Sequence, residues 1–136
     1  MESIIVSGNL ESLDVISDYV TTAAEKANLD SKKTYKLRLA VDEIATNIVI
    51  HGYQEAEIKG EILCKAEFSD TSLKIHLEDS GMQYDATQKE QPDDLYKPLE
   101  ERNIGGLGIY LAINGVDKYI YERHGNSNLN IFIVNR

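Results

Sequence analysis

The N-terminal half of the chain combines one short strand pattern with two helical patterns. Apolar residues at Ile4 and Val6 predict a short strand. Apolar residues then recur at three- and four-residue spacing over 10–27, which predicts a helix. A polar break follows, in which Asp30 or Ser31 can cap a second helix that runs to Gly52. The core stripe of this second helix is Leu37, Val41, Ile44 and Ile48.

The C-terminal half is dominated by β-rich runs. Residues 61–68 and 72–78 flank a polar break and predict a hairpin. Periodicity is lost over 80–103, and a run of this length inside a compact domain is typically functional or disordered. A short helix is expected over 109–113. The last two predicted strands, joined by a turn, are 118–123 and 128–134.

This order of elements predicts an α+β fold, a two-layer sandwich with helices on one face of a mainly antiparallel, mixed sheet. With 136 residues, of which 42% are hydrophobic, we expect one core and a single domain over 1–136. No apolar run approaches the roughly 20 residues that cross a bilayer, and the N-terminus lacks a basic region, so we expect a cytoplasmic protein without a membrane partner. The single cysteine, Cys64, lies in a strand pattern and is expected to act as a small hydrophobe.

Charge narrows the choice of partners. The chain has 14 Lys and Arg against 23 Asp and Glu, a formal net charge of −9, and no basic stripe. Binding of nucleic acid requires basic side chains that neutralise the phosphate backbone. We therefore expect no direct contact with DNA or RNA, and an acidic, solvated surface.

One group of polar side chains follows the second predicted helix. Glu43, Asn47 and His51 are four residues apart, so they form a single stripe beside the apolar face. Such a stripe is either an ordinary boundary between core and solvent or a rigid presentation of a carboxylate and an amide to a groove. In the second case Asn47 can supply a hard oxygen ligand to Mg²⁺. His51 is interpreted as a structural residue at the helix end.

Two further segments allow a structural or a functional interpretation. The first is Glu78-Asp79-Ser80-Gly81, which is typical of an ordinary turn. Alternatively, it is a strand end at which Asp79 accepts a hydrogen bond from an exocyclic amine and Gly81 allows a flat ring to approach the backbone. The glycine run 104–108 is either a turn or a set of backbone N–H groups that face an anion at a helix N-terminus. A Gly-x-x-x-x-Gly-Lys-Ser/Thr motif is missing from the sequence, which excludes a P-loop.

The ordered combination of these segments is more specific than any one of them. In chain order they read Arg38-Leu39-Ala40-Val41-Asp42-Glu43-Ile44-Ala45-Thr46-Asn47 with His51-Gly52-Tyr53, then Asp79-Ser80-Gly81 with Tyr84-Asp85, then Gly105-Gly106-Leu107-Gly108-Ile109-Tyr110-Leu111. This pattern resembles the anti-sigma factor serine-protein kinases. They belong to an ATP-binding superfamily that includes gyrase, the histidine kinases and a heat-shock chaperone, and the resemblance covers nearly the whole chain.

The resemblance implies a site for ATP and Mg²⁺. Asn47 would coordinate Mg²⁺ that bridges the phosphates, and Asp79 would accept from the adenine amino group. Gly81 would let the adenine lie close to the backbone. The residues implied to bind the phosphates are Gly105, Gly106, Leu107 and Gly108.

The resemblance also implies a base and a lid. Glu43 matches the residue that takes a proton from a partner serine as its hydroxyl attacks the γ-phosphoryl group. Residues 82–104 match the ATP lid, and Arg102 near its end is either a contact of the terminal phosphate or a solvated residue. The lid is acidic, which is unusual beside a triphosphate, so its carboxylates are expected to face solvent or a partner. These carboxylates are Glu90, Asp93, Asp94, Glu100 and Glu101.

The favoured functional hypothesis is an ATP-dependent serine-protein kinase that acts as an anti-sigma regulatory factor. It would phosphorylate an anti-anti-sigma (antagonist) protein, bind a sigma factor or similar signalling protein, and form a homodimer, as the resemblance implies. The alternative is a non-catalytic module in which ATP selects protein partners without phosphoryl transfer. A structural domain with a decayed site is less favoured, because Asn47, Asp79 and the glycines are all present.

Overall fold

The computed structural model describes residues 1–83 and 104–136 of the chain. The elements of its first half are β1 (Ile4–Ser7), η1 (Leu10–Ser12), α1 (Leu13–Lys26), α2 (Ser31–Asn47) and η2 (Ile48–Gln54). Those of the second half are β2 (Glu61–Phe68), β3 (Ser72–Asp79), α4 (Ile104–Ile113), β4 (Lys118–His124) and β5 (Ser127–Asn135). Nearly all of the expected lid, Arg102 included, lies outside the described residues.

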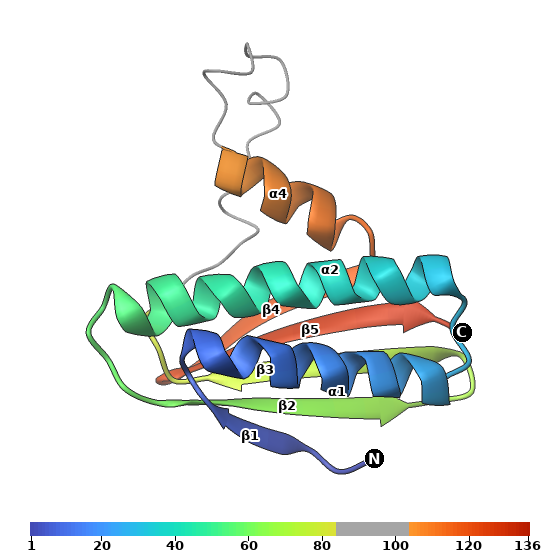
Figure 1. Ribbon diagram of the computed structural model, residues 1–136, viewed down its shortest axis with the longest axis horizontal. Coiled ribbons are helices and arrows are strands. Elements are labelled where there is room, and N and C mark those ends of the chain that lie inside the picture. Colours follow the sequence, from blue (N-terminus) through green and yellow to red (C-terminus); the bar gives the residue numbers. More distant parts are fainter. Residues whose placement is uncertain (84–103) are drawn as a thin grey trace.

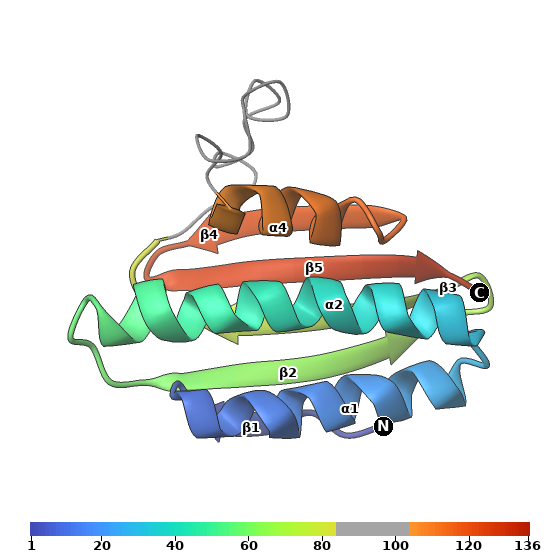
Figure 2. The same cartoon turned by 45° about the horizontal axis from the view of Figure 1, so that its top comes forward.

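The five strands form one sheet in the order β1-β2-β3-β5-β4, and each of the four pairings is antiparallel. Figures 1 and 2 show α1, α2 and α4 side by side over one face of this sheet. The predicted α+β sandwich is therefore confirmed. None of the helices in the described part of the chain is long and apolar enough to span a membrane.

The core lies between the helices and the covered face of the sheet. In β3, the alternation predicted from sequence is confirmed, because Leu73, Ile75 and Leu77 are all buried on that face. Cys64 is buried on the neighbouring strand, and burial raises the pKa of its thiol to about 12, so it packs as an apolar group. The next inward position of β3 after Leu77 is occupied by Asp79, a carboxylate at the edge of the core.

The second helix begins as predicted and continues beyond its predicted end. The Asp30 side chain accepts from the backbone N–H of Lys33 at 2.8 Å, which is an N-cap. The helical path does not stop at Gly52 but continues through the π-helical turn η2. Gly52 is buried inside this helical path instead of ending it, and its carbonyl accepts from the Met82 N–H at 2.8 Å.

The last helix is longer than predicted. The sequence indicated a helix over 109–113 preceded by a glycine loop, but α4 already begins at Ile104 and includes the glycines. Glycine weakens a helix by about 1 kcal/mol relative to alanine without forbidding it. The first four N–H groups of a helix lack acceptors within it, so the start of α4 still offers backbone donors.

Candidate functional site

The side chain of Asp79 is the most unusual polar group in the described part of the core. It is 4% exposed, and its Oδ1 accepts from the Gly81 N–H at 2.9 Å and from the Asn128 side-chain amide at 3.0 Å. Its other oxygen, Oδ2, is buried and has no hydrogen-bond partner among the described residues. Burial raises the pKa of Asp79, and the bonds from Asn128 and Gly81 and the charge of Arg123 oppose this shift. Oδ2 is therefore a desolvated acceptor without a donor among the described residues.

Gly81 brings the turn after β3 into contact with the end of the second helical run, the continuous helical path formed by α2 and η2. A Cβ at this position would lie 2.7 Å from the Gly52 carbonyl oxygen and 2.9 Å from its carbon. Real Cβ atoms essentially never approach backbone this closely. Glycine is required here, so the backbone beside Asp79 stays flat and without a side chain.

Tyr53 joins three segments beside this turn. Its buried hydroxyl donates to the Glu61 carbonyl at 2.6 Å and accepts from the Ser80 N–H at 3.0 Å. Its ring fills the space above Gly8 and Gly60, where a Cβ would lie 2.4 and 2.7 Å from ring atoms. Tyr53 stood in a motif but had no role in the sequence-based prediction; the structure shows that it holds Ser80, the residue between Asp79 and Gly81.

Asn128 is a second residue of this site that was not predicted. It is 3% exposed and lies opposite Asp79 in the β3–β5 register. Its Nδ2 donates to Asp79 Oδ1 and to the Gly81 carbonyl, each at 3.0 Å. The available sequence signal was a pair of asparagines, Asn128 and Asn130, at inward positions of β5 that precede the apolar inward positions Phe132 and Val134.

The polar stripe on α2 occupies the edge of the core, as its spacing predicted. Glu43 and Asn47 are both half-buried, and the Asn47 Nδ2 donates to the Glu43 carbonyl at 2.7 Å. The amide oxygen of Asn47 is then the end of the side chain that can ligate a hard cation. His51 lies 2.5 Å from Glu55 Oε1, a contact within the helical turn that fits its expected structural role.

The glycine run lies at the start of α4. Gly105, Gly106 and Leu107 are among the first four residues of the helix, whose N–H groups lack intrahelical acceptors, and Gly108 is the fifth. Figures 1 and 2 both place this N-terminal end of α4 towards the end of the molecule at which β3 terminates. The roles predicted for these glycines remain predictions.

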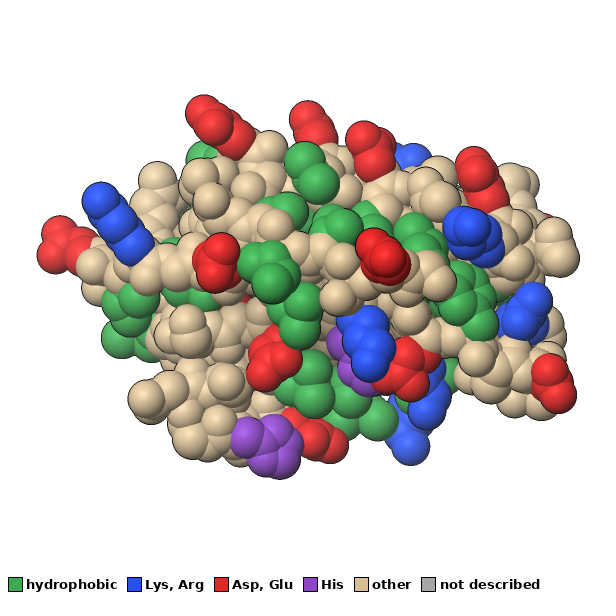
Figure 3. Space-filling model, turned by 90° about the horizontal axis from the view of Figure 1, so that it is seen from below, with side chains coloured by type: hydrophobic (Ala, Val, Ile, Leu, Met, Phe, Trp, Pro, Cys, Tyr) green, Lys and Arg blue, Asp and Glu red, His purple; other side chains and the backbone are tan. Residues whose placement is uncertain are grey.

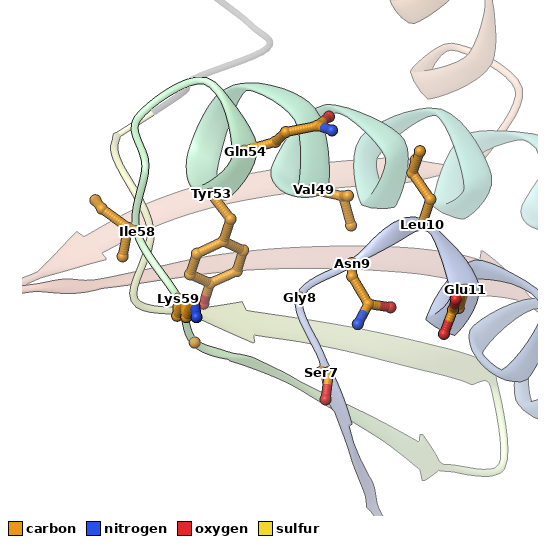
Figure 4. Close-up of a pocket in the computed structure, with 11 residues that line it drawn as sticks. Ser7, Gly8, Asn9, Leu10, Glu11, Val49, Tyr53, Gln54, Ile58 and Lys59 are labelled. Atoms are coloured by element: carbon orange, nitrogen blue, oxygen red, sulfur yellow. The ribbon is translucent and has the colours of Figure 1, made fainter.

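A separate hollow of about 590 Å³ lies between the turn after β1 and the connection from η2 to β2 (Figure 4). Its lining includes Asn9, Tyr53 and Lys59 but none of the predicted site residues. Tyr53 borders the hollow with its ring, while its hydroxyl reaches Ser80. The hollow is therefore a neighbour of the Asp79 turn and not the predicted site.

The arrangement around Asp79 offers one acceptor to a hydrogen-bond donor. An amine N–H can donate to a carboxylate oxygen such as Oδ2, and the neighbouring Gly81 carries no side chain because the Gly52 backbone occupies that space. The structure brings together Asp79, Gly81 and Asn128, and places Glu43 and Asn47 on the helical run that reaches the same turn through Gly52.

Comparison with known sequences finds a matching family model and curated relatives that share one name. A family model described as a histidine kinase-like ATPase domain matches residues 6–132. The chain is 32% identical over 91 residues to the serine-protein kinase RsbW of Bacillus subtilis (strain 168), covering 65% of this chain and 56% of the relative. It is 36% identical over 85 residues to RsbW of Bacillus velezensis, covering 60% and 52%. The chain thus spans about half the length of the curated relatives it matches.

Solved structures show the same fold. The histidine kinase domain of the Erythrobacter litoralis EL346 blue-light activated histidine kinase has a TM-score of 0.55 at 14% identity, over 90% of this chain and 59% of that one. The Acinetobacter baumannii histidine kinase AdeS has a TM-score of 0.53 at 11% identity, over 99% and 68%. The resemblance to serine-protein kinases inferred from the motifs is confirmed by relatives of that name. Because the family model matches nearly the whole sequence, the chain belongs to the histidine kinase-like ATPase domain family.

Proposed function

We propose that this protein is an ATP-dependent serine-protein kinase that phosphorylates an anti-anti-sigma (antagonist) protein and binds a sigma factor or similar signalling protein. The observation that carries the nucleotide part is the buried Asp79 Oδ2, which has no partner within residues 1–83 and 104–136, beside the side-chain-free backbone of Gly81. The protein-kinase part is supported by relatives named serine-protein kinase and by a carboxylate, Glu43, one helical turn before Asn47.

Each side chain has a distinct task in nucleotide binding. Asp79 Oδ2 accepts a hydrogen bond from the adenine amine, and the backbone at Gly81 lies against the ring. The N–H groups at the start of α4 donate to phosphate oxygens, where the positive end of the helix dipole favours an anion. Asn47 offers its amide oxygen to Mg²⁺, which neutralises charge on the phosphates when bound.

Glu43 is proposed as the general base. Its half-buried carboxylate takes the proton from the hydroxyl of a partner serine as the serine oxygen forms a bond to the γ-phosphorus. The bond between that phosphorus and the bridging oxygen of ADP breaks in the same step, and ADP leaves with the electron pair. The rest of the barrier is lowered by positioning and by charge neutralisation.

The kinase activity is tested with labelled ATP, Mg²⁺ and a candidate antagonist protein. Glu43→Gln should reduce serine labelling about 10²- to 10⁴-fold, the usual contribution of a general base, while ATP affinity stays within about twofold. Glu25→Gln, an exposed change on α1, is the matched control and should label normally. If the unaltered protein binds ATP but labels no serine, the kinase proposal is wrong and the non-catalytic ATP-binding module is favoured.

The uncovered face of the sheet is proposed as the surface through which two copies pair. The register places Ile5 opposite Leu63, and Ile131 opposite both Ile120 and His76, on the face away from the helices. Ile5 is 64% exposed. Seen from below, hydrophobic side chains gather across the middle of the molecule among charged ones of both signs (Figure 3).

The charges on this face suit a second copy. The outward positions of the strands carry three lysines and four glutamates, whereas the whole chain has 23 acidic against 14 basic residues. They are Lys65, Lys74, Lys118, Glu61, Glu67, Glu78 and Glu122. In a two-fold dimer the same patch meets itself, so a nearly balanced, partly apolar face avoids the repulsion expected between the other acidic surfaces.

A further inference from the structure

We propose that Asn128 is a positioning residue that determines which oxygen of Asp79 faces the nucleotide, and thereby sets the preference for a purine that carries an exocyclic amine. This inference rests on the proposed binding of ATP and adds a residue that neither the motifs nor the relatives' names indicate. The contacts of the Asn128 side chain carry it.

The side-chain amide of Asn128 uses its full hydrogen-bonding capacity inside the protein. Its Nδ2 donates to Asp79 Oδ1 and to the Gly81 carbonyl, both at 3.0 Å. Its Oδ1 accepts from the Tyr121 hydroxyl at 2.6 Å and from Arg123 Nη1 at 2.7 Å. A side-chain amide has two N–H donors and two acceptor positions, so all four are occupied.

These partners allow only one orientation of the amide. A guanidinium can only donate and a backbone carbonyl can only accept. Turning the amide over would place its oxygen against the Gly81 carbonyl and the Asp79 carboxylate, and its NH₂ group against Arg123. Asn128 therefore always presents N–H to Asp79 Oδ1.

This orientation selects the acceptor that remains for a ligand. Asp79 Oδ1 accepts hydrogen bonds from the Asn128 side chain and from the Gly81 N–H. Oδ2 is then the oxygen without a partner in the described structure. A purine with an amine at C6 donates to Oδ2, whereas a purine without the amine leaves a buried carboxylate oxygen unpaired. Such a mismatch is more costly than the loss of one exposed hydrogen bond.

The charges that face Asp79 favour its ionised, accepting form. Arg123, on β4, donates to the Asn128 side chain. Its positive charge opposes the rise in the pKa of Asp79 that burial causes. Glu78, on the other face of β3, acts in the opposite direction as a weaker influence. The hydroxyls of Tyr121 and Tyr53 are further polar groups that neighbouring elements bring to this turn.

The test measures, by calorimetry, the affinities for ATP and for purine riboside 5′-triphosphate, which lacks the C6 amine. The unaltered protein should prefer ATP at least tenfold. Asn128→Asp replaces the donor with a second carboxylate, so at pH 8 the preference should fall to less than threefold through loss of ATP affinity alone. At pH 6, one proton shared by the two carboxylates restores a donor to Asp79, and the preference should return.

Asn130→Asp is the matched control. Asn130 is buried on the same face of the same strand and accepts from the Tyr119 hydroxyl, but it lies opposite Leu77 and not Asp79. This variant should keep the preference for ATP at both pH values. Tyr121→Phe and Tyr119→Phe form a milder pair that preserves the asparagines. Only Tyr121→Phe should weaken the preference, by about fivefold for the loss of one neutral hydrogen bond.

The outcomes separate this inference from the proposed function. If the unaltered protein binds neither nucleotide, the proposed function fails and this inference fails with it. If it prefers ATP and the Asn128→Asp and Tyr121→Phe variants keep that preference, only the inference on Asn128 is wrong. An equal loss of both nucleotides in Asn128→Asp, without recovery at pH 6, would show a merely structural role and overturn the inference.

Discussion

The carboxyl group of Asp79 is buried, and one of its oxygens has no hydrogen-bond partner among the described residues. Burial raises the pKa of this group, so the folded chain holds the proton more tightly than the unfolded chain does. Above the folded-state pKa the ionised group therefore lowers the free energy of unfolding. The penalty disappears as the pH falls through that raised pKa towards the ordinary aspartate value of about 4. A residue retained at such a cost is expected to act in binding.

Replacing Asp79 should therefore separate stability from binding. Asp79→Asn should raise the free energy of unfolding at pH 7 by roughly 1 kcal/mol, because an unpartnered amide costs less than an unpartnered charge. The gain should shrink as the pH is lowered. ATP affinity should fall about 10- to 100-fold, since a hydrogen bond to a charged acceptor contributes roughly 1.5–3 kcal/mol.

Urea unfolding between pH 4 and pH 8 and calorimetry with ATP measure these effects. Asp70→Asn, an exposed change in the turn between β2 and β3, should alter neither quantity. A variant at position 79 that is less stable than the unaltered protein at pH 7, or that binds ATP equally well, contradicts the assignment.

At the scale of elements, the site depends on one contact between the second helical run and the turn after β3. The Gly52 carbonyl accepts from the Met82 N–H, and Gly81 packs directly against Gly52. Tyr53, the next residue along η2, holds Ser80 through its hydroxyl. The π-helical turn η2 thereby positions the backbone beside Asp79, in keeping with the frequent occurrence of such turns at functional sites.

Two glycine-to-alanine changes test this contact. Gly81→Ala should lower the free energy of unfolding by about 1–3 kcal/mol, because its Cβ would lie 2.7 Å from the Gly52 carbonyl oxygen. It should also weaken ATP binding at least tenfold, because the turn beside Asp79 must shift. In Gly52→Ala the nearest atom to the new Cβ, the Met82 carbonyl oxygen, is 3.7 Å away, an ordinary contact. Equal losses of stability in the two variants, measured by urea unfolding, would show that the close packing of Gly81 against Gly52 is unimportant.

At the scale of the whole molecule, the helices cover one face of the sheet, and no helix of the described residues covers the other face (Figures 1 and 2). The proposed pairing of two copies through the uncovered face explains why Ile5, on an edge strand, is largely exposed. It would also leave the helical face, with Glu43 and Asn47, accessible to protein partners.

Sedimentation equilibrium at micromolar concentration measures this pairing. The unaltered protein should be a dimer, and Ile131→Lys should shift it at least tenfold towards monomer, because a charge would be buried at the centre of the interface. Ile5→Lys, at a largely exposed position, should act in the same direction with less risk to folding. Val15→Lys on α1, at a side chain that is 49% exposed on the helical layer, should leave the dimer unchanged. A monomeric unaltered protein would refute the proposed interface.

Local patterns in the sequence were sufficient for most elements. The alternation of Leu73, Ile75 and Leu77 predicted a half-buried strand, because side chains of a strand point to alternate faces. Asp30 was predicted as a cap, because its side chain can reach an N–H three residues along the chain. The spacing of Glu43 and Asn47 predicted their common stripe on the helix, and the motif order predicted the family.

Other features were decided only by the tertiary structure. Asn128 meets Asp79 across 49 positions of sequence through the register of β3 and β5, and no local pattern encodes that pairing. Gly52 was interpreted as a stop and Gly81 allowed a turn, and only their mutual contact shows why position 81 has no room for a side chain. The sequence alone determined the fold class and the residue types available for chemistry, because these follow from short-range periodicity and propensity. The tertiary structure decided which oxygen of Asp79 has no partner in the described part of the chain, because that depends on donors supplied by another strand.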